Sequence, residues 1–234
     1  AEELKSVYTT YLAAENAKRP KKNFFEEFMN PTPRIEEMAI DNAMLEKKAG
    51  EADIALITIG RNAGEGRDRK VENDFNLKEA ELKIINDISD AFHAKNKNVV
   101  VIINSGGIIE VASWQNKVDA ILIAWQPGLE AGNAVADVLS GKVNPSGKLT
   151  SSFPVKYDDV PSAKSFPGIE FPDKAETGMF GMKINPAQVT YDEGVYVGYR
   201  YYNTFKVKTA YPFGYGMSYT TFNYSGLKLS STTF

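Results

Sequence analysis

One acidic side chain has the surroundings that an acid catalyst needs. It is Glu65, which stands between Gly64 and Gly66 in the segment GRNAGEGRDRK at 60–70. Glycine neighbours let the backbone adopt unusual dihedral angles and leave the side chain between them unshielded. The cationic side chains that follow can tune the pKa of a nearby carboxyl, as a general acid requires. Glu65 is therefore the candidate catalytic residue.

Two other interpretations of this loop remain open on the residues alone. Composition favours a solvated turn, because turns prefer Gly and Asp whatever their function. A phosphate-binding loop is disfavoured, since the spacing fits neither GxGxxG nor GxxxxGK[ST] and Glu65 would repel phosphate. If the loop is a site, we expect Asp68 or Arg69 to brace it through an ion pair.

Composition excludes several classes of function. The chain has 234 residues, of which 43% are hydrophobic and 24% charged, and its net charge is −3, so we expect a packed domain and no nucleic-acid partner. No apolar run approaches the roughly 20 residues of a membrane helix, so no membrane partner is expected. Without cysteine there can be no disulfide, thiolate nucleophile or zinc–thiolate site. A histidine-based triad or metal site would have to use His93, which we expect to be an ordinary exposed helix residue, so neither metal nor cofactor is predicted.

The N-terminus suggests a processed or excised chain. It begins at Ala1 rather than Met, and residues 1–22 are amphipathic rather than signal-like. The absence of cysteine does not decide the compartment, and a periplasmic or secreted location is favoured slightly over a cytoplasmic one.

Strands and helices alternate around the Glu65 loop. Buried parallel strands are predicted over 53–59, 99–103 and 120–125, and helices over 82–92, with Asn76 as N-cap, and 128–139. The fold class is therefore α/β, a mostly parallel sheet flanked by helices. Ligands of such sheets bind beyond the carboxyl ends of the strands, where the Glu65 loop lies.

The remaining segments are less regular. Apolar periodicity predicts helices over 4–11, 24–28 and 35–50, and a short helix over 108–114 after a Gly106–Gly107 turn. Residues 144–190 hold six of the eleven prolines and predict extended chain. We expect Trp114 and Trp125 in the core, Gln126, Gly128 and Gly132 in a strand-to-helix turn, and Tyr199, Tyr201 and Tyr202 with Arg200 in packing between domains. Residues 222–234 alternate partly and resemble one strand of a separate β-domain.

Four segments together resemble glycoside hydrolase family 3, especially bacterial β-glucosidases. They are GEGRDR with NDFNL after it, WQPGLEAGNAVADVLSGKVNPSGKLTSSFP at 125–154, YDEGVYVGYRYYNTF at 191–205 and YPFGYGMSYTTFNYS at 211–225. They occur in the family's order between residues 60 and 225, which makes the resemblance specific.

The resemblance implies a function and two domains. The family hydrolyses terminal β-D-glucosyl residues with retention, using an Asp nucleophile on an N-terminal (β/α)8 barrel and a Glu acid/base on the α/β sandwich domain. That Glu maps onto Glu65. Residues 1–215 would be part of this sandwich domain, and 216–234 would enter a fibronectin type III-like domain. The nucleophile lies outside the chain, so we expect the chain alone to be inactive.

The resemblance also names partners and leaves an alternative. β-Glucosides or oligosaccharides would be substrates, the absent barrel would dock beside the loop, and the surface meant for it could permit self-association. Arg67 stands where the family often has Tyr, and Arg67 and Asp68 are candidate substrate-binding residues. The alternative is a non-catalytic carbohydrate-binding or assembly module, which calorimetry of the isolated chain with glucose or cellobiose would detect. The choice between glucoside and xyloside stays open.

Overall fold

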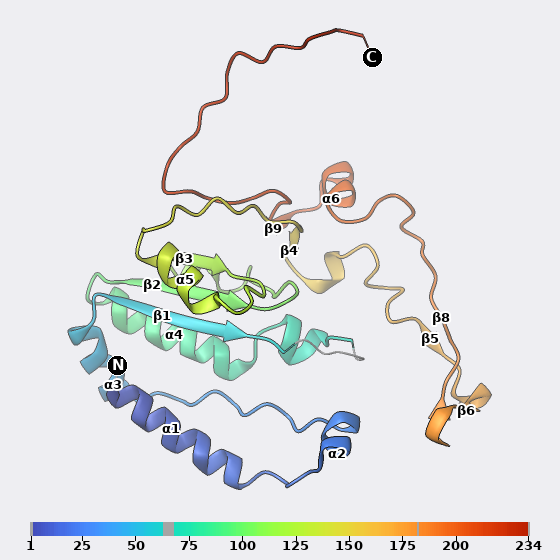
Figure 1. Ribbon diagram of the computed structural model, residues 1–234, viewed down its shortest axis with the longest axis horizontal. Coiled ribbons are helices and arrows are strands. Elements are labelled where there is room, and N and C mark those ends of the chain that lie inside the picture. Colours follow the sequence, from blue (N-terminus) through green and yellow to red (C-terminus); the bar gives the residue numbers. More distant parts are fainter. Residues whose placement is uncertain (1, 63–67, 182, 234) are drawn as a thin grey trace. The chain divides into compact units, whose positions relative to one another are not determined.

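A three-stranded parallel sheet carries the loops of interest. Its strands are β1 (Ile54–Gly60), β2 (Asn98–Asn104) and β3 (Ala120–Ile123), in the order β1-β2-β3 (Figure 1). β2 and β3 pair in parallel, with Val100 opposite Ala120 and Ile103 opposite Ile123. The α/β class and the first two strands are therefore confirmed. The third strand ends at Ile123, two residues earlier than predicted.

The computed structural model describes residues 2–62, 68–181 and 183–233. The chain divides into two compact units, each made of several segments. The first unit is Ala1–Gly60, Glu72–Ile103 and Trp114–Ile123, and the second is Arg61–Val71, Asn104–Ser113 and Ala124–Phe234. The three strands of the parallel sheet thus belong to the first unit, except for Asn104 at the end of β2, and the loops that follow these strands belong to the second.

The core of the first unit lies between the sheet and helix α4 (Glu79–His93), which runs along β1 (Figure 1). β1 alternates, with Ala55, Ile57 and Ile59 buried while the intervening side chains are exposed. β2 is buried over its five central residues, as its continuous Val/Ile run predicts. From α4, Ile85 and Phe92 are 0% and 5% exposed. The 3.6-residue period of α4 thus places an apolar stripe against the sheet.

Three helices precede the sheet. They are α1 (Glu2–Ala17), α2 (Phe24–Met29) and α3 (Asn42–Glu51). The first two confirm the predicted periodicity. The predicted helix over 35–50 is wrong in its first part, because residues 35–41 are not helical. The Asp41 carboxylate accepts a hydrogen bond from the N–H of Met44 at 3.0 Å and so caps α3 at Asn42.

The start of α4 also differs from the prediction. Asn76 is not its N-cap; Lys78 is, and its N–H donates to the Glu81 carboxylate at 2.9 Å. A π-helical turn, η1 (Val71–Phe75), precedes it, and within that turn Asn73 has a φ of 62°. This left-handed residue redirects the chain, so the helix begins later than its apolar pattern suggests.

The C-terminus of α4 is tied to the start of β3 through His93. Its Nε2 lies 3.0 Å from Oδ2 of Asp119, which also accepts the N–H of Val99 at 2.7 Å. The Val99 N–H and His93 together lower the pKa of Asp119. His93 is exposed, as predicted, but it has a specific partner rather than none.

No α-helix forms over 108–114, contrary to the prediction. Residues 112–114 form a turn that leads into the short 3₁₀ helix η2 (Gln115–Lys117). The Glu110 carboxylate accepts hydrogen bonds from both the N–H and the hydroxyl of Ser113, at 2.7 Å each, so a side chain closes this turn. Trp114 is 2% exposed and confirms its predicted place in the core.

The second unit contains α5 (Ala131–Leu139), which begins three residues later than predicted. Gly128, with a φ of 76°, turns the chain before the helix, and Ser140 caps its end. Trp125 is half-buried, and its ring contacts that of Phe153 at a centroid distance of 6.1 Å. Phe153 itself is 1% exposed, so this aromatic pair forms part of the core of the second unit.

Residues 144–190, of which 182 is not described, contain no α-helix in their described part, as the prolines predict, and short antiparallel pairs hold this region. These are β4 (Phe153–Pro154) with β9 (Thr209–Tyr211), β5 (Ile169–Glu170) with β8 (Ala187–Gln188), and β6 (Glu176–Thr177) with β7 (Lys183–Ile184). The 3₁₀ helices are η3 (Tyr157–Asp159), η4 (Pro172–Lys174) and η5 (Met179–Gly181). One helix, α6 (Tyr199–Phe205), lies between β8 and β9, and it buries Tyr202. Burial raises the pKa of Tyr202 to about 12.

Residues 212–233 form no helix or strand in the described chain. The predicted strand over 222–234 is therefore not confirmed as a strand. Its apolar side chains are exposed, among them Phe222, Tyr224, Leu227 and Leu229. Among the residues described, no helix has the length and apolar character needed to cross a membrane.

Replacing Ile85 tests the core between α4 and the sheet. Ile85 is 0% exposed, so Ile85→Ala should lower the free energy of unfolding by about 2–5 kcal/mol, because it removes buried methyl groups and leaves a cavity. Urea unfolding followed by circular dichroism measures the loss. Leu129 is 100% exposed, and Leu129→Ala, the control, should change stability by less than about 0.5 kcal/mol. Equal losses in the two variants would contradict this description of the core.

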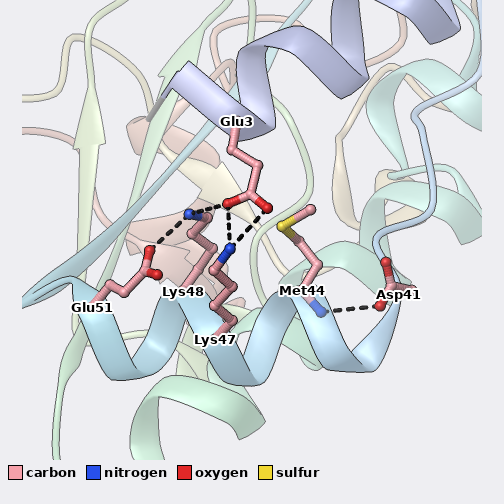
Figure 2. A network of polar contacts seen from close by, with 6 residues as sticks. All are labelled: Glu3, Asp41, Met44, Lys47, Lys48 and Glu51. Atoms are coloured by element: carbon pink, nitrogen blue, oxygen red, sulfur yellow. Dashed lines mark hydrogen bonds and ion pairs between the residues drawn. The ribbon is translucent and has the colours of Figure 1, made fainter.

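An ion network joins α1 to α3 at the surface (Figure 2). Both Lys47 and Lys48 donate to the Glu3 carboxylate at 2.8 Å, and these hydrogen bonds lower the pKa of Glu3 to about 2 from its ordinary value of 4.5. Because the carboxyl binds its proton less readily when folded, its stabilising effect is complete above pH 4.5 and is lost as the pH falls toward 2. The effect is small, since the side chains of Glu3 and Lys47 are 43% and 52% exposed.

Glu3→Gln should therefore loosen α1 above pH 4.5, and its difference from the unchanged chain should shrink as the pH is lowered or salt is added. Hydrogen exchange of the α1 amides over a series of pH values measures this. Glu2→Gln is the matched control, because Glu2 only approaches Lys5 at 4.0 Å and is 90% exposed. A pH-independent effect of Glu3→Gln would argue against the network.

Candidate functional site

The loops that follow the strands meet through a backbone hydrogen bond. Arg61 comes directly after β1, and its N–H donates to the carbonyl of Asn104, the last residue of β2, at 3.0 Å. Ser105 then opens the loop after β2. Because parallel strands end at the same edge of a sheet, loops distant in sequence come together here.

A polar cavity of about 240 Å³ lies among these loops. Its lining residues all belong to the second unit; they are Arg61, Asn62, Arg69, Ser105, Gly106, Gly107 and Gln126. Two arginines, an asparagine and a glutamine are among the residues that line this space, which is below the usual range of drug-sized pockets, roughly 300–1,000 Å³. Groups of this kind donate hydrogen bonds to hydroxyl and carboxylate oxygens.

The turn after β2 is held by Ser105, which is 1% exposed. Its hydroxyl donates to the carbonyl of Gly107 at 2.8 Å and lies 3.3 Å from the N–H of the same residue. A buried hydroxyl with both partners within one turn fixes the path of the backbone. The predicted tight turn at Gly106–Gly107 is therefore present, and its conformation depends on Ser105.

Arg69 lies over this turn. Its Nη1 donates to the carbonyl of Ile108 at 2.8 Å, and the side chain is partly buried. A Cβ atom added to Gly107 would lie 2.6 Å from the same nitrogen. The guanidinium therefore occupies the space that a side chain at position 107 would need.

Gln126 covers the neighbouring glycine. A Cβ atom on Gly106 would lie 2.8–2.9 Å from the amide group of Gln126. The preceding residue, Trp125, has a φ of 53°, an unusual value for a bulky residue. The predicted strand-to-helix turn at Gln126 and Gly128 is thus present, whereas Gly132 lies inside α5.

Some of the candidate site residues lie within the described part of the chain, and others lie outside it. Glu65 and Arg67 lie outside the described residues. Asp68 is exposed and does not line the cavity. An ion pair from Asp68 or Arg69 to the loop stays a prediction; among the described residues, Arg69 donates a hydrogen bond to the backbone carbonyl of Ile108.

The cavity also contains residues that the sequence analysis did not select as site residues. Arg61, Asn62 and Ser105 each lie within two residues of a strand end. Position at the carboxyl end of a predicted strand was the available signal. We predicted only a structural role in a turn for Gln126, and the structure also places this residue in the lining of the cavity.

A smaller cavity occurs elsewhere among the described residues. A second cavity, in the first unit, measures about 50 Å³ and includes Leu45, Ile84 and Ile88 in its lining. This is close to the space of one or two water molecules, at about 30 Å³ each, and too small for a sugar ring. Within the described ranges, no group of three or more His, Asp or Glu side chains could hold a metal ion.

Comparison with known proteins gives a consistent result. Residues 5–199 match the family described as Glycosyl hydrolase family 3 C-terminal domain. β-Glucosidase A of Butyrivibrio fibrisolvens is 38% identical over 217 residues, which cover 80% of this chain and 24% of that protein. An exo-α-(1→6)-L-arabinopyranosidase of Bifidobacterium longum is 34% identical over 203 residues, covering 86% of this chain and 23% of that protein.

Solved structures agree. The structure of β-glucosidase 3B from Thermotoga neapolitana in complex with glucose has a TM-score of 0.84 and 43% identity, covering 99% of this chain and 30% of that one. The chain thus spans about a quarter of the length of these two relatives and 30% of the solved chain.

Removing the Ser105 hydroxyl tests the turn beneath the cavity. Ser105→Ala should lower the free energy of unfolding by about 1–3 kcal/mol, because it leaves partly buried backbone groups of Gly107 without the Ser105 hydroxyl as their partner. Urea unfolding measures the loss. In the control Ser231→Ala, the hydroxyl bonds only within the exposed C-terminal segment, and stability should change by less than about 0.5 kcal/mol. Indistinguishable losses would mean that the Ser105 contacts do not hold the turn.

Proposed function

Because the chain belongs to the glycosyl hydrolase family 3 C-terminal domain family, we propose that it supplies the general acid/base, Glu65, of a retaining β-glucosidase. The intact enzyme would release terminal β-D-glucosyl residues from the non-reducing ends of β-glucosides or oligosaccharides. The nucleophile, an Asp on a (β/α)8 barrel, lies outside this chain. The chain by itself is expected to be inactive.

The observation that carries the proposal is the polar cavity beside the Glu65 segment. Two of its lining residues, Asn62 and Arg69, stand on either side of residues 63–67 in the chain. Glu65 is three residues from Asn62, and three residues span at most about 11 Å of backbone, so the length of chain allows the proposed acid to act at this cavity. The loop also follows a parallel strand, where α/β sheets bind their ligands.

The chemistry requires two carboxyl groups about 5 Å apart on either side of the glycosidic bond. The barrel Asp attacks the anomeric carbon, and the protonated Glu65 gives its proton to the departing oxygen. Glu65 then removes a proton from the water that attacks the glycosyl–enzyme bond, so both carboxyls return to their first states. Dividing the two groups between domains makes catalysis depend on docking of the barrel.

The relatives support a glycoside substrate without choosing the sugar. Two relatives of similar identity are named for different activities, a β-glucosidase and an α-L-arabinopyranosidase. The barrel would therefore select the sugar in the catalytic subsite. We assign Arg67 and Asp68 to the leaving-group side, because they follow Glu65 directly in the chain.

The chain ends would serve assembly. We propose that residues 1–215 form part of the sandwich domain and that 216–234 are the linker and first strand of a fibronectin type III-like domain. The exposed side chains of Phe222, Tyr224 and Leu227 support this, since a strand needs neighbours to pair with and cover it. Without its barrel, the chain would also tend to self-associate.

Glu65→Gln in the intact enzyme tests the catalytic assignment. The variant should lose about 10²–10⁴-fold in kcat/KM on cellobiose, whose leaving group needs protonation. An activated dinitrophenyl glucoside should lose far less, because its leaving group departs without a proton. Azide should restore turnover by replacing the water that needs a general base.

The matched control is Glu72→Gln, since Glu72 is an exposed carboxylate a few residues further along the chain. It should leave kcat/KM unchanged on both substrates. Equal loss on both substrates in Glu65→Gln, with no rescue by azide, would contradict the acid/base role. Saturable binding of cellobiose by the isolated chain in calorimetry would favour a carbohydrate-binding module instead.

A further inference from the structure

We infer that Arg69 is a positioning residue, which anchors the backbone on the C-terminal side of the acid/base segment to the turn after β2, and that Gly107 is required because it leaves room for the guanidinium. This rests on the proposed function of Glu65 and adds to it two residues that act through the loop. The four residues that carry the inference, Arg69, Ser105, Gly107 and Ile108, are all described and belong to the second unit.

The residues on either side of the acid/base segment are tied to one short segment, residues 104–108. On the side before Glu65, the N–H of Arg61 donates to the carbonyl of Asn104 at 3.0 Å. On the side after it, Nη1 of Arg69 donates to the carbonyl of Ile108 at 2.8 Å. Residues 104–108 therefore receive both ends of the stretch that carries the proposed acid.

Buried residues and their hydrogen bonds fix residues 104–108 in place. Ser105 is 1% exposed and bonds to Gly107 through its hydroxyl. Beyond Ile108 the chain enters the core, since Ile109 and Val111 are 1% and 0% exposed. The carbonyl that accepts from Arg69 is thus held on both sides by buried residues. A fixed acceptor lets a long, flexible side chain define the position of the backbone that bears it.

Gly107 leaves free the space that the Arg69 guanidinium occupies. A Cβ atom there would lie 2.6 Å from Nη1 of Arg69, a distance too short for any packed contact. The atom that must move is the far end of a flexible side chain, so alanine displaces the guanidinium at little cost to the fold. Gly107→Ala therefore breaks the contact to Ile108 without removing a charge or any atom of Arg69.

This displacement should lower the catalytic rate, because proton transfer depends strongly on distance. A shift of about 1 Å at a reacting group can cost on the order of 100-fold in rate. If Arg69 acts through Glu65, the loss must show the substrate pattern of a weakened acid. It should be large for a leaving group that needs a proton and small for one that does not.

The experiment compares Arg69→Met and Gly107→Ala in the intact enzyme. Each should lower kcat/KM on cellobiose by about 10–100-fold, and on the dinitrophenyl glucoside by only a few-fold. The control is Gly132→Ala, because a Cβ atom on Gly132 would meet nothing within 4 Å; both rates should stay unchanged. Thermal unfolding of every variant verifies that the fold is intact, and Gly107→Ala keeps the test decisive if Arg69→Met unfolds.

The double variant Arg69→Met/Gly107→Ala shows whether the two changes act through one contact. If the Gly107 effect passes through the guanidinium, the double variant should lose no more than Arg69→Met alone on cellobiose. Multiplied losses would overturn the inference. So would an equal loss on both substrates in either single variant.

The same assays with Glu65→Gln keep the two proposals apart. If Glu65→Gln shows the leaving-group pattern and Arg69→Met does not, the positioning role is wrong and the acid/base assignment stands. If Glu65→Gln lacks the pattern, the acid/base assignment fails, and the positioning inference fails with it.

Discussion

The hydrogen bond between the N–H of Arg61 and the carbonyl of Asn104 is the constraint on which the site depends. It joins the residue that leaves β1 to the last residue of β2, so the loops after both strands start from a shared position. The polar cavity, the seat of the Arg69 guanidinium and the approach of Gln126 to Gly106 all lie within a few residues of this bond. Loops carry function best when a rigid scaffold sets their ends, and here the scaffold is a parallel strand pair.

The strands were the most predictable part of the fold, because a continuous β-branched run has few alternatives to a buried strand. The limits of the helices were less predictable, since they depend on single hydrogen bonds. Asp41 caps α3 six residues after Ile35, where the apolar periodicity begins, and Asn73 turns the chain before α4. Over 108–114, the Glu110 carboxylate closes a turn that the apolar pattern alone suggested was helical. Periodicity identifies which face is buried and says little about where a helix starts.

The site was predictable to a different degree. Glycine neighbours and the family resemblance select Glu65, and the position of strand ends could have selected Ser105 and Asn62. The match of Arg69 to Gly107 could not be read from the chain, because a 2.6 Å approach depends on how two separate loops fold back on each other. A glycine required for space looks the same in a sequence as a glycine required for a turn. Only coordinates tell the two apart.

The seating of Arg69 over Gly107 has a consequence for exchanging parts between related enzymes. A loop transplanted from a relative brings its own side chain to position 69, while the turn that must accommodate it stays with the recipient. The two segments must therefore be exchanged together, although a helix and a strand separate them along the chain. Chimeras whose junction lies between residues 69 and 107 separate Arg69 from Gly107, whereas chimeras that exchange residues 61–108 as one block keep the pair together.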